Sequence, residues 1–211
     1  MLKLENITLK IFGEYLFSPI SVEILGGQIT TVMGPSGCGK SSLLSYLCGT
    51  LSSEISGSGK IIINGKDVQN IFPHLRKFGI LFQDDLLFPH LSVGENLAFA
   101  LPTKFKKKER YDKILIALEE IELSGMYDRD PATLSGGQKV RVALMRTLLS
   151  EPKALLLDEP FAKLDQGLRE RFRYLVFEHA KRYNLPTLLV THDYADARAA
   201  EGPVEPHALR R

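Results

Sequence analysis

The chain has 211 residues, of which 44% are hydrophobic and 25% charged, and its formal net charge at pH 7 is +2. This composition is that of an ordinary globular protein with one sizeable core and room for a subdomain. So small a net charge gives no reason to expect a nucleic-acid partner, because binding through phosphates needs a concentrated basic surface. No apolar run approaches the length of a membrane span and the polar, acidic start is unlike a secretory signal, so we expect a cytoplasmic protein.

Two segments near the start alternate apolar and polar residues. Residues 2–9 and 21–24 show this period of two, which predicts an antiparallel pair of strands. Phe12 and Tyr15 lie between them. An aromatic ring here could stack on a purine or could fill core or surface, and spacing alone leaves both interpretations open.

A glycine-rich segment follows the predicted strand 28–33 and precedes a predicted helix over 42–47. Residues 34–41 read GPSGCGKS and fit the pattern G-x-x-x-x-G-K-[ST]. Glycines let the backbone curl and point N–H groups at a polyphosphate, a lysine can bridge the outer phosphates, and a serine hydroxyl can bind Mg²⁺. An ordinary glycine-rich turn has no use for that lysine and serine. The candidate nucleotide-binding residues here are Gly34, Pro35, Ser36, Gly37, Cys38, Gly39, Lys40, Ser41 and Ser42.

The two cysteines, Cys38 and Cys48, lack the spacing of metal ligands or of a disulfide framework. Cys38 lies in the glycine-rich segment, where a helix N-terminus can lower the pKa of a thiol and make it reactive. A small residue that merely fits is an equal alternative.

The middle of the chain predicts short strands and then helices. Residues 51–59, rich in Ser and Gly, predict a loop, followed by a strand over 60–63 and a hairpin turn. Residues 79–82 predict another strand that ends at Gln83, whose amide could reach a metal ion or a water. Residues 92–95 fit a capping box and 104–122 predict a longer helix, so we expect a helical subdomain over about 84–150.

Residues 134–138 read LSGGQ and permit two interpretations. Ser135 and Gln138 fit a capping box that opens a helix. Gly136 and Gly137 are not expected if the segment serves only as a helix cap, because each glycine costs a helix roughly 1 kcal/mol relative to alanine. Bare backbone at a helix start indicates a second anion site.

Two further predicted strands end in polar residues. Residues 154–157 are apolar and precede Asp158 and Glu159, which suit water-mediated Mg²⁺ binding and a general base. Residues 187–190 form the last predicted strand, and His192 follows it. The carboxyl end of a strand in an α/β sheet is where ligands bind, so we expect His192 to contact the terminal phosphate.

Because it contains these motifs, the chain resembles the ATP-binding subunits of ABC transporters over residues 2–193. The resemblance implies a P-loop NTPase of α/β class with a core parallel sheet, an antiparallel β subdomain and a helical subdomain. It makes Gln83 the Q-loop residue at the bound Mg²⁺, with Ser41 and Asp158 as its other ligands, and Phe12 the aromatic at the adenine. The motifs are the phosphate loop at 34–41, the signature at 134–138, the D-loop at Ala162, Lys163, Leu164 and Asp165, the catalytic Glu159 and the switch histidine His192.

The resemblance also implies partners. Two copies face each other head to tail, so that Ser135, Gly136, Gly137 and Gln138 of one complete the ATP site of the other. Residues 82–96 look like those of importers that act with a membrane permease and a periplasmic solute-binding protein, which places the chain on the cytoplasmic face of the membrane. An exporter subunit, a lipoprotein-release subunit and a soluble non-transport ATPase are the alternatives. Residues 194–211 form a tail that is short and atypical for such subunits.

Overall fold

The computed structural model describes residues 1–84, 86–162, 164–200 and 204–205. Contacts divide the chain into two compact units. The first comprises Met1–Ile80, Lys153–Glu159 and Leu175–Arg211, and the second comprises Leu81–Pro152 and Pro160–Tyr174. The glycine-rich segment at residues 34–41 belongs to the first unit, and so do Asp158, Glu159 and His192.

An antiparallel sheet of five strands opens the first unit. Its path is β2-β1-β5-β6, and β3 pairs with β1 as predicted. Side chains alternate between buried and less buried along β1, as expected for a sheet with one face on the core. The strands are β1 (Leu2–Ile11), β2 (Glu14–Tyr15), β3 (Ile20–Ile24), β5 (Ile55–Ile63) and β6 (Lys66–Asp67).

The prediction of a loop over residues 51–59 is wrong from Ile55 onward, because β5 already begins there. Its glycines allow close approach to the helix Lys40–Cys48 and to the neighbouring strand. A Cβ on Gly57 would lie 2.5 Å from the Tyr46 ring, and a Cβ on Gly59, where φ is +112°, would lie 2.6 Å from the carbonyl oxygen of Asn6. Pairing with β1 therefore overrides the local composition, which is typical of a loop.

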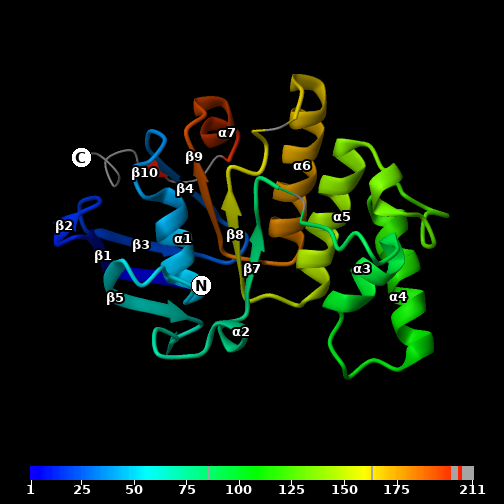
Figure 1. Cartoon of the computed structure of the whole chain (residues 1–211), viewed down its shortest axis with the longest axis horizontal. Coiled ribbons are helices and arrows are strands. Elements are labelled where there is room, and N and C mark those ends of the chain that lie inside the picture. The colour runs from blue at the N-terminus through cyan, green and yellow to red at the C-terminus, as the bar shows by residue number, and fades with distance from the viewer. Residues whose placement is uncertain (85, 163, 201–203, 206–211) are drawn as a thin grey trace. The chain divides into compact units, whose positions relative to one another are not determined.

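A parallel sheet forms the other half of the first unit, with strand order β10-β4-β9-β8-β7 (Figure 1). Every residue of β4 and β9 is buried, which explains the continuous apolar and β-branched runs in their sequences. The strands are β4 (Ile29–Met33), β7 (Phe78–Leu81), β8 (Ala154–Asp158), β9 (Thr187–Thr191) and β10 (Val204–Glu205).

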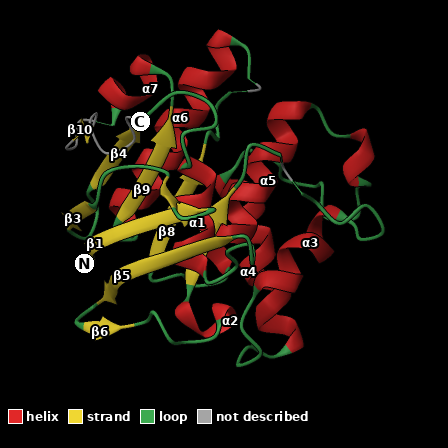
Figure 2. Ribbon diagram, turned by 60° about the vertical axis from the view of Figure 1, so that its left-hand side comes forward, coloured by secondary structure: helices red, strands yellow, loops and turns green. Residues whose placement is uncertain are grey.

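Helix α1 (Lys40–Cys48) contributes to one apolar core with both sheets, whose strands Figure 2 shows in yellow. Leu43 and Leu47 of α1 belong to the same buried cluster as Leu4 of β1 and Leu188 of β9. This burial fixes α1 along its length. The other helices that lie wholly in this unit are α2 (Pro73–Arg76) and α7 (Tyr194–Ala199).

The tail begins with regular structure. The Asp193 side chain caps α7, and β10 pairs in parallel with β4. Residues 201–203 and 206–211 of the predicted tail lie outside the described residues.

The second unit is largely helical. Its helices are α3 (Val93–Ala100), α4 (Lys107–Glu120), the 3₁₀ helix η1 (Pro131–Thr133), α5 (Gly136–Leu149) and the start of α6 (Gln166–Arg182). The predicted capping boxes are present at Ser92 of α3 and at Ser135 of α5. The side chain of Asn96, which is fully buried, donates to the carbonyls of Phe88, Leu91 and Ser92 and so holds the segment before α3.

Candidate functional site

Two left-handed backbone positions shape the glycine-rich loop between β4 and α1. Gly37 and Gly39 have φ of +79° and +97°, values that residues with a Cβ rarely adopt. A Cβ on Gly39 would approach the Phe17 ring to 3.2 Å. Gly39 is also the N-cap of α1 and offers no side-chain hydrogen bond, so a phosphate can accept from the first N–H groups of the helix.

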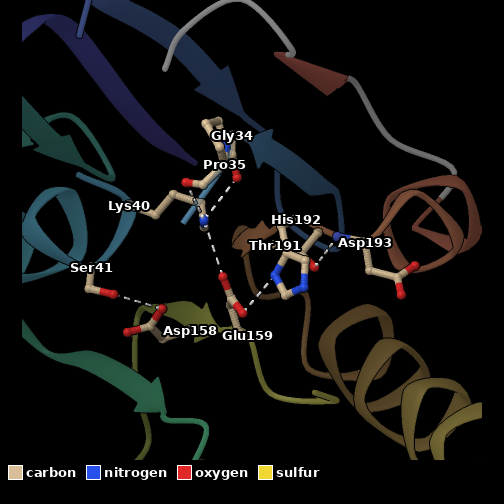
Figure 3. A network of polar contacts seen from close by, with 9 residues as sticks. All are labelled: Gly34, Pro35, Lys40, Ser41, Asp158, Glu159, Thr191, His192 and Asp193. Atoms are coloured by element: carbon tan, nitrogen blue, oxygen red, sulfur yellow. Dashed lines mark hydrogen bonds and ion pairs between the residues drawn. The ribbon is translucent and has the colours of Figure 1, made fainter. Parts of the chain in front are cut away.

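The Lys40 side chain is buried at the start of α1. Its ammonium donates hydrogen bonds to the carbonyls of Gly34 at 2.9 Å and Pro35 at 3.1 Å, and lies 3.1 Å from Glu159 Oε1 (Figure 3). A buried charge requires such partners, since an uncompensated one is strongly destabilising. A phosphate that binds Lys40 would therefore replace one or more of these three oxygens as a partner of the ammonium.

Ser41 and Asp158 connect the start of α1 to the end of β8. Ser41 Oγ donates to Asp158 Oδ1 at 3.2 Å (Figure 3). Burial raises the pKa of the Asp158 carboxyl above its usual value, although the Ser41 hydrogen bond opposes this. A hydroxyl and a carboxylate are the oxygen donors that Mg²⁺ prefers, so this donor set fits a magnesium ion held together with phosphates.

Glu159 and His192 meet at the carboxyl ends of β8 and β9. Glu159 Oε2 lies 2.8 Å from His192 Nδ1, and the Glu159 N–H donates to the Val190 carbonyl at 3.0 Å. Burial raises the pKa of the Glu159 carboxyl, but hydrogen bonds from His192 and Lys40 outweigh it and hold the pKa below its usual value. Glu159 is therefore ionised at neutral pH and can accept a proton.

The structure thus brings five candidate residues together: Lys40, Ser41, Asp158, Glu159 and His192. The sequence analysis did not predict two hydrogen bonds that anchor the residues on either side of His192. The Asp193 N–H donates to Thr191 Oγ1 at 3.1 Å, and Asp193 Oδ1 accepts from the N–H of Ala195 at 2.7 Å. An aspartate directly before a short helical segment is an N-cap signal, which could have revealed this anchor beside His192.

The other loop positions differ in exposure. Pro35, Ser36 and Gly37 are exposed and Ser42 is half-buried, whereas Cys38 is buried in the core cluster. Burial limits access to the Cys38 thiol, which favours the alternative that Cys38 is a small residue that fits.

The two aromatic candidates lie on or beside the short β1–β2 hairpin. Phe12 is 87% exposed and has a φ of +50°. Tyr15 is 59% exposed, and Lys10 Nζ lies 4.3 Å from its ring centroid. Both rings present faces that a planar base could cover, and the interaction with Lys10 already engages Tyr15.

The remaining candidates belong to the second unit. Gln83 follows β7 and is exposed. Ser135 Oγ accepts from the Gln138 N–H at 3.3 Å, and Gln138 Oε1 accepts from the Ser135 N–H at 2.9 Å. Gly136 is exposed and Gly137 is buried. The capping box and an anion site are therefore compatible at this helix start. In the predicted D-loop, Lys163 lies outside the described residues.

Among the described residues, no helix is both long and apolar enough to cross a bilayer.

The comparisons with known proteins all find similarity to ATP-binding proteins of ABC transporters. The family model described as "ABC transporter" matches residues 17–162. The chain is 45% identical over 199 residues to the uncharacterized ABC transporter ATP-binding protein YnjD of Escherichia coli K12, covering 94% of this chain and 92% of YnjD. It is 42% identical to the maltose/maltodextrin import ATP-binding protein MalK of Yersinia pestis, covering 91% of this chain but only 53% of MalK.

A solved structure agrees with these relatives. The ATP-binding cassette MJ0796, in a dimeric post-hydrolysis state bound to ADP and Pi, superposes with a TM-score of 0.77 at 30% identity and covers all of both chains.

Proposed function

Because the chain belongs to the ABC transporter family, as an ATP-binding subunit with ATPase activity, we propose that it energises solute import through a separate membrane permease. The observation that supports ATP hydrolysis as the energy source is the set of contacts that joins Lys40 to Glu159 and His192, with the Ser41–Asp158 hydrogen bond beside it. These groups lie at one end of the parallel sheet, where ligands of open α/β sheets bind.

In the proposed site, the backbone of the glycine-rich loop and Lys40 bind the phosphates of ATP, and the Phe12 ring covers the base. Ser41 and Asp158 would hold Mg²⁺, with Gln83 as the further ligand that the family resemblance implies. When bound, Mg²⁺ neutralises charge on the outer phosphate oxygens. Glu159 accepts a proton from the attacking water, for which its lowered pKa keeps it ionised. His192 orients the Glu159 carboxylate through Nδ1.

We further propose that two copies of the chain form the working unit. Ser135, Gly136, Gly137 and Gln138 would then close over the nucleotide bound by Lys40 of the partner. Support comes from MJ0796, which is dimeric in its ADP- and Pi-bound state, and from the exposed start of α5. ATP would favour the closed dimer and hydrolysis the open one.

The direction of transport rests on relatives. MalK is named for import, and this favours import over the alternatives, an exporter or lipoprotein-release subunit and a soluble non-transport ATPase. We place the chain on the cytoplasmic face of the membrane, beside a permease and a solute-binding protein. Affinity purification from membranes tests this: a co-purifying integral membrane protein is expected, and a chain found only in the soluble fraction would contradict transport.

The catalytic proposal is tested by Glu159→Gln. The variant should still bind ATP and should accumulate as a dimer, while hydrolysis falls by at least about 10²-fold, as expected when a general base is lost. Glu151→Gln is the matched control, because Glu151 is an exposed partner of Lys104 in the second unit, and it should hydrolyse normally. Undiminished turnover by Glu159→Gln would exclude Glu159 as the base.

A further inference from the structure

The two glycines of the signature have different surroundings. A Cβ on Gly136 would meet no atom within 4 Å, whereas a Cβ on Gly137 would lie 2.6 Å from Leu168 Cδ2, 2.9 Å from Cδ1 and 3.2 Å from Cγ. Rotation about the Leu168 Cβ–Cγ bond moves the two methyls but leaves Cγ in place, so the tight 3.2 Å approach to Cγ would remain. Gly137 is therefore a point of close approach between α5 and α6.

Leu168 is in turn held by the last residue of the D-loop. Asp165 Oδ1 accepts from the Leu168 N–H at 3.0 Å, and the Asp165 carbonyl accepts from the Arg169 N–H at 2.8 Å. The first turn of α6 is thus anchored on Asp165. The Leu168 side chain then lies on the bare face of Gly137.

The start of the D-loop is tied to α6 as well. The Phe161 ring is fully buried and packs edge-to-face on Phe172 with 5.8 Å between centroids. The Phe161 carbonyl accepts from the Leu164 N–H at 3.2 Å. Both ends of the D-loop therefore connect to α6, and α6 connects to the signature through Leu168.

We propose that Leu168 is a positioning residue of the signature: it seats on Gly137 and links the D-loop to the start of α5, while Gly136 alone keeps the open backbone. This inference rests on the proposed function. On this proposal, Gly137 must be a glycine because Leu168 of the same subunit packs against it. Gly136 must be a glycine because the nucleotide of the partner approaches its backbone. A shift of the D-loop would then move the signature of the same subunit.

The test is a compensation experiment in the full chain. Gly137→Ala should lower the melting temperature by about 2–8 °C through overpacking and should reduce ATPase activity by about 10- to 100-fold through misplacement of the signature. Leu168→Ala removes the three atoms that the added Cβ would approach. The double variant G137A/L168A should therefore recover the melting temperature and most of the activity relative to Gly137→Ala.

Gly136→Ala is the matched control. Its Cβ meets open space, so it should leave the melting temperature nearly unchanged, and Leu168→Ala should not restore whatever activity it loses. Equal compensation at both glycines, or a double variant that recovers stability without activity, would overturn the assignment. The melting temperatures, measured without nucleotide, test the packing even if the wild-type chain hydrolyses no ATP, a result that would instead reject the proposed function.

Discussion

The starts of α1 and α5 are both rich in glycine, yet they are built differently. At α1 the N-cap is Gly39, which provides no side-chain hydrogen bond, and Lys40 lies directly behind it. At α5 the N-cap is Ser135, whose hydroxyl accepts from the Gln138 N–H within a complete capping box. The first start is thus open toward an anion and has its own cation. The second is satisfied by its own side chains.

This difference supports the proposal that the α1 start forms most of a nucleotide site and the α5 start complements the site of a partner. Lys40 contacts Glu159 within its own unit, and Glu159 contacts His192. The Ser135 hydroxyl accepts from the Gln138 N–H and can still donate its own O–H to a phosphate in the proposed dimer. A helix start with its own cation at α1 and one that offers only uncharged donors at α5 would suit the proposed interface, which closes and reopens.

The largest effect on ATP binding is expected from Lys40→Met. The change removes the buried ammonium and leaves Glu159 without its cationic partner, so ATP affinity should fall by about 10²- to 10³-fold, as for the loss of one member of a buried charge pair. Isothermal titration calorimetry measures this loss. Lys60→Met, at an exposed lysine of β5, is the control, and equal losses in both variants would contradict a specific role for Lys40.

His192→Ala should change the pH dependence of turnover. The hydrogen bond from His192 helps to lower the pKa of Glu159 against the opposing effect of burial. Without it the Glu159 pKa rises, so Glu159 becomes protonated at higher pH and the acidic limb of kcat moves to higher pH. A pH–rate profile measures the limb. A reduced kcat with an unmoved limb would show that His192 does not act through Glu159.

Two variants of Ser135 separate capping from phosphate binding. Ser135→Ala removes the cap and should lower the melting temperature by about 1–8 °C, from a cap worth about 0.5–2 kcal/mol. Ser135→Asp keeps the cap and should preserve the melting temperature. It should nevertheless abolish turnover, because its charge repels phosphate. An active Ser135→Asp would argue against contact with nucleotide.

The smallest effect concerns Cys48, in the last turn of α1. Burial raises the pKa of the Cys48 thiol to about 12, so the thiol stays protonated and unreactive at neutral and moderately alkaline pH. Iodoacetamide should label the native chain at neither cysteine, because Cys38 is buried too, and should label both after denaturation. Fast labelling of the native chain that ATP slows would instead restore the hypothesis of a reactive Cys38.

Much of the fold could be predicted from periodicity. The buried parallel strands β4, β8 and β9 appear in the sequence as short apolar runs, and the capping boxes of α3 and α5 as four-residue patterns. The ABC ATPase fold inferred from the motifs is confirmed by the structural neighbour. The start of β5 was missed, because Gly57 and Gly59 are typical of loops and only pairing with β1 shows that they are strand residues.

The sequence by itself determined which chemical groups are available: a lysine and a serine after a glycine-rich loop, two carboxylates after one strand and a histidine after another. Tertiary structure alone decided how they meet. Lys40 and Glu159 are far apart in the chain and come within 3.1 Å because α1 follows β4 and Glu159 follows β8 at the same end of one parallel sheet. The different surroundings of Gly136 and Gly137 likewise depend on α6, since the position of a distant leucine is a property of packing that local sequence does not encode.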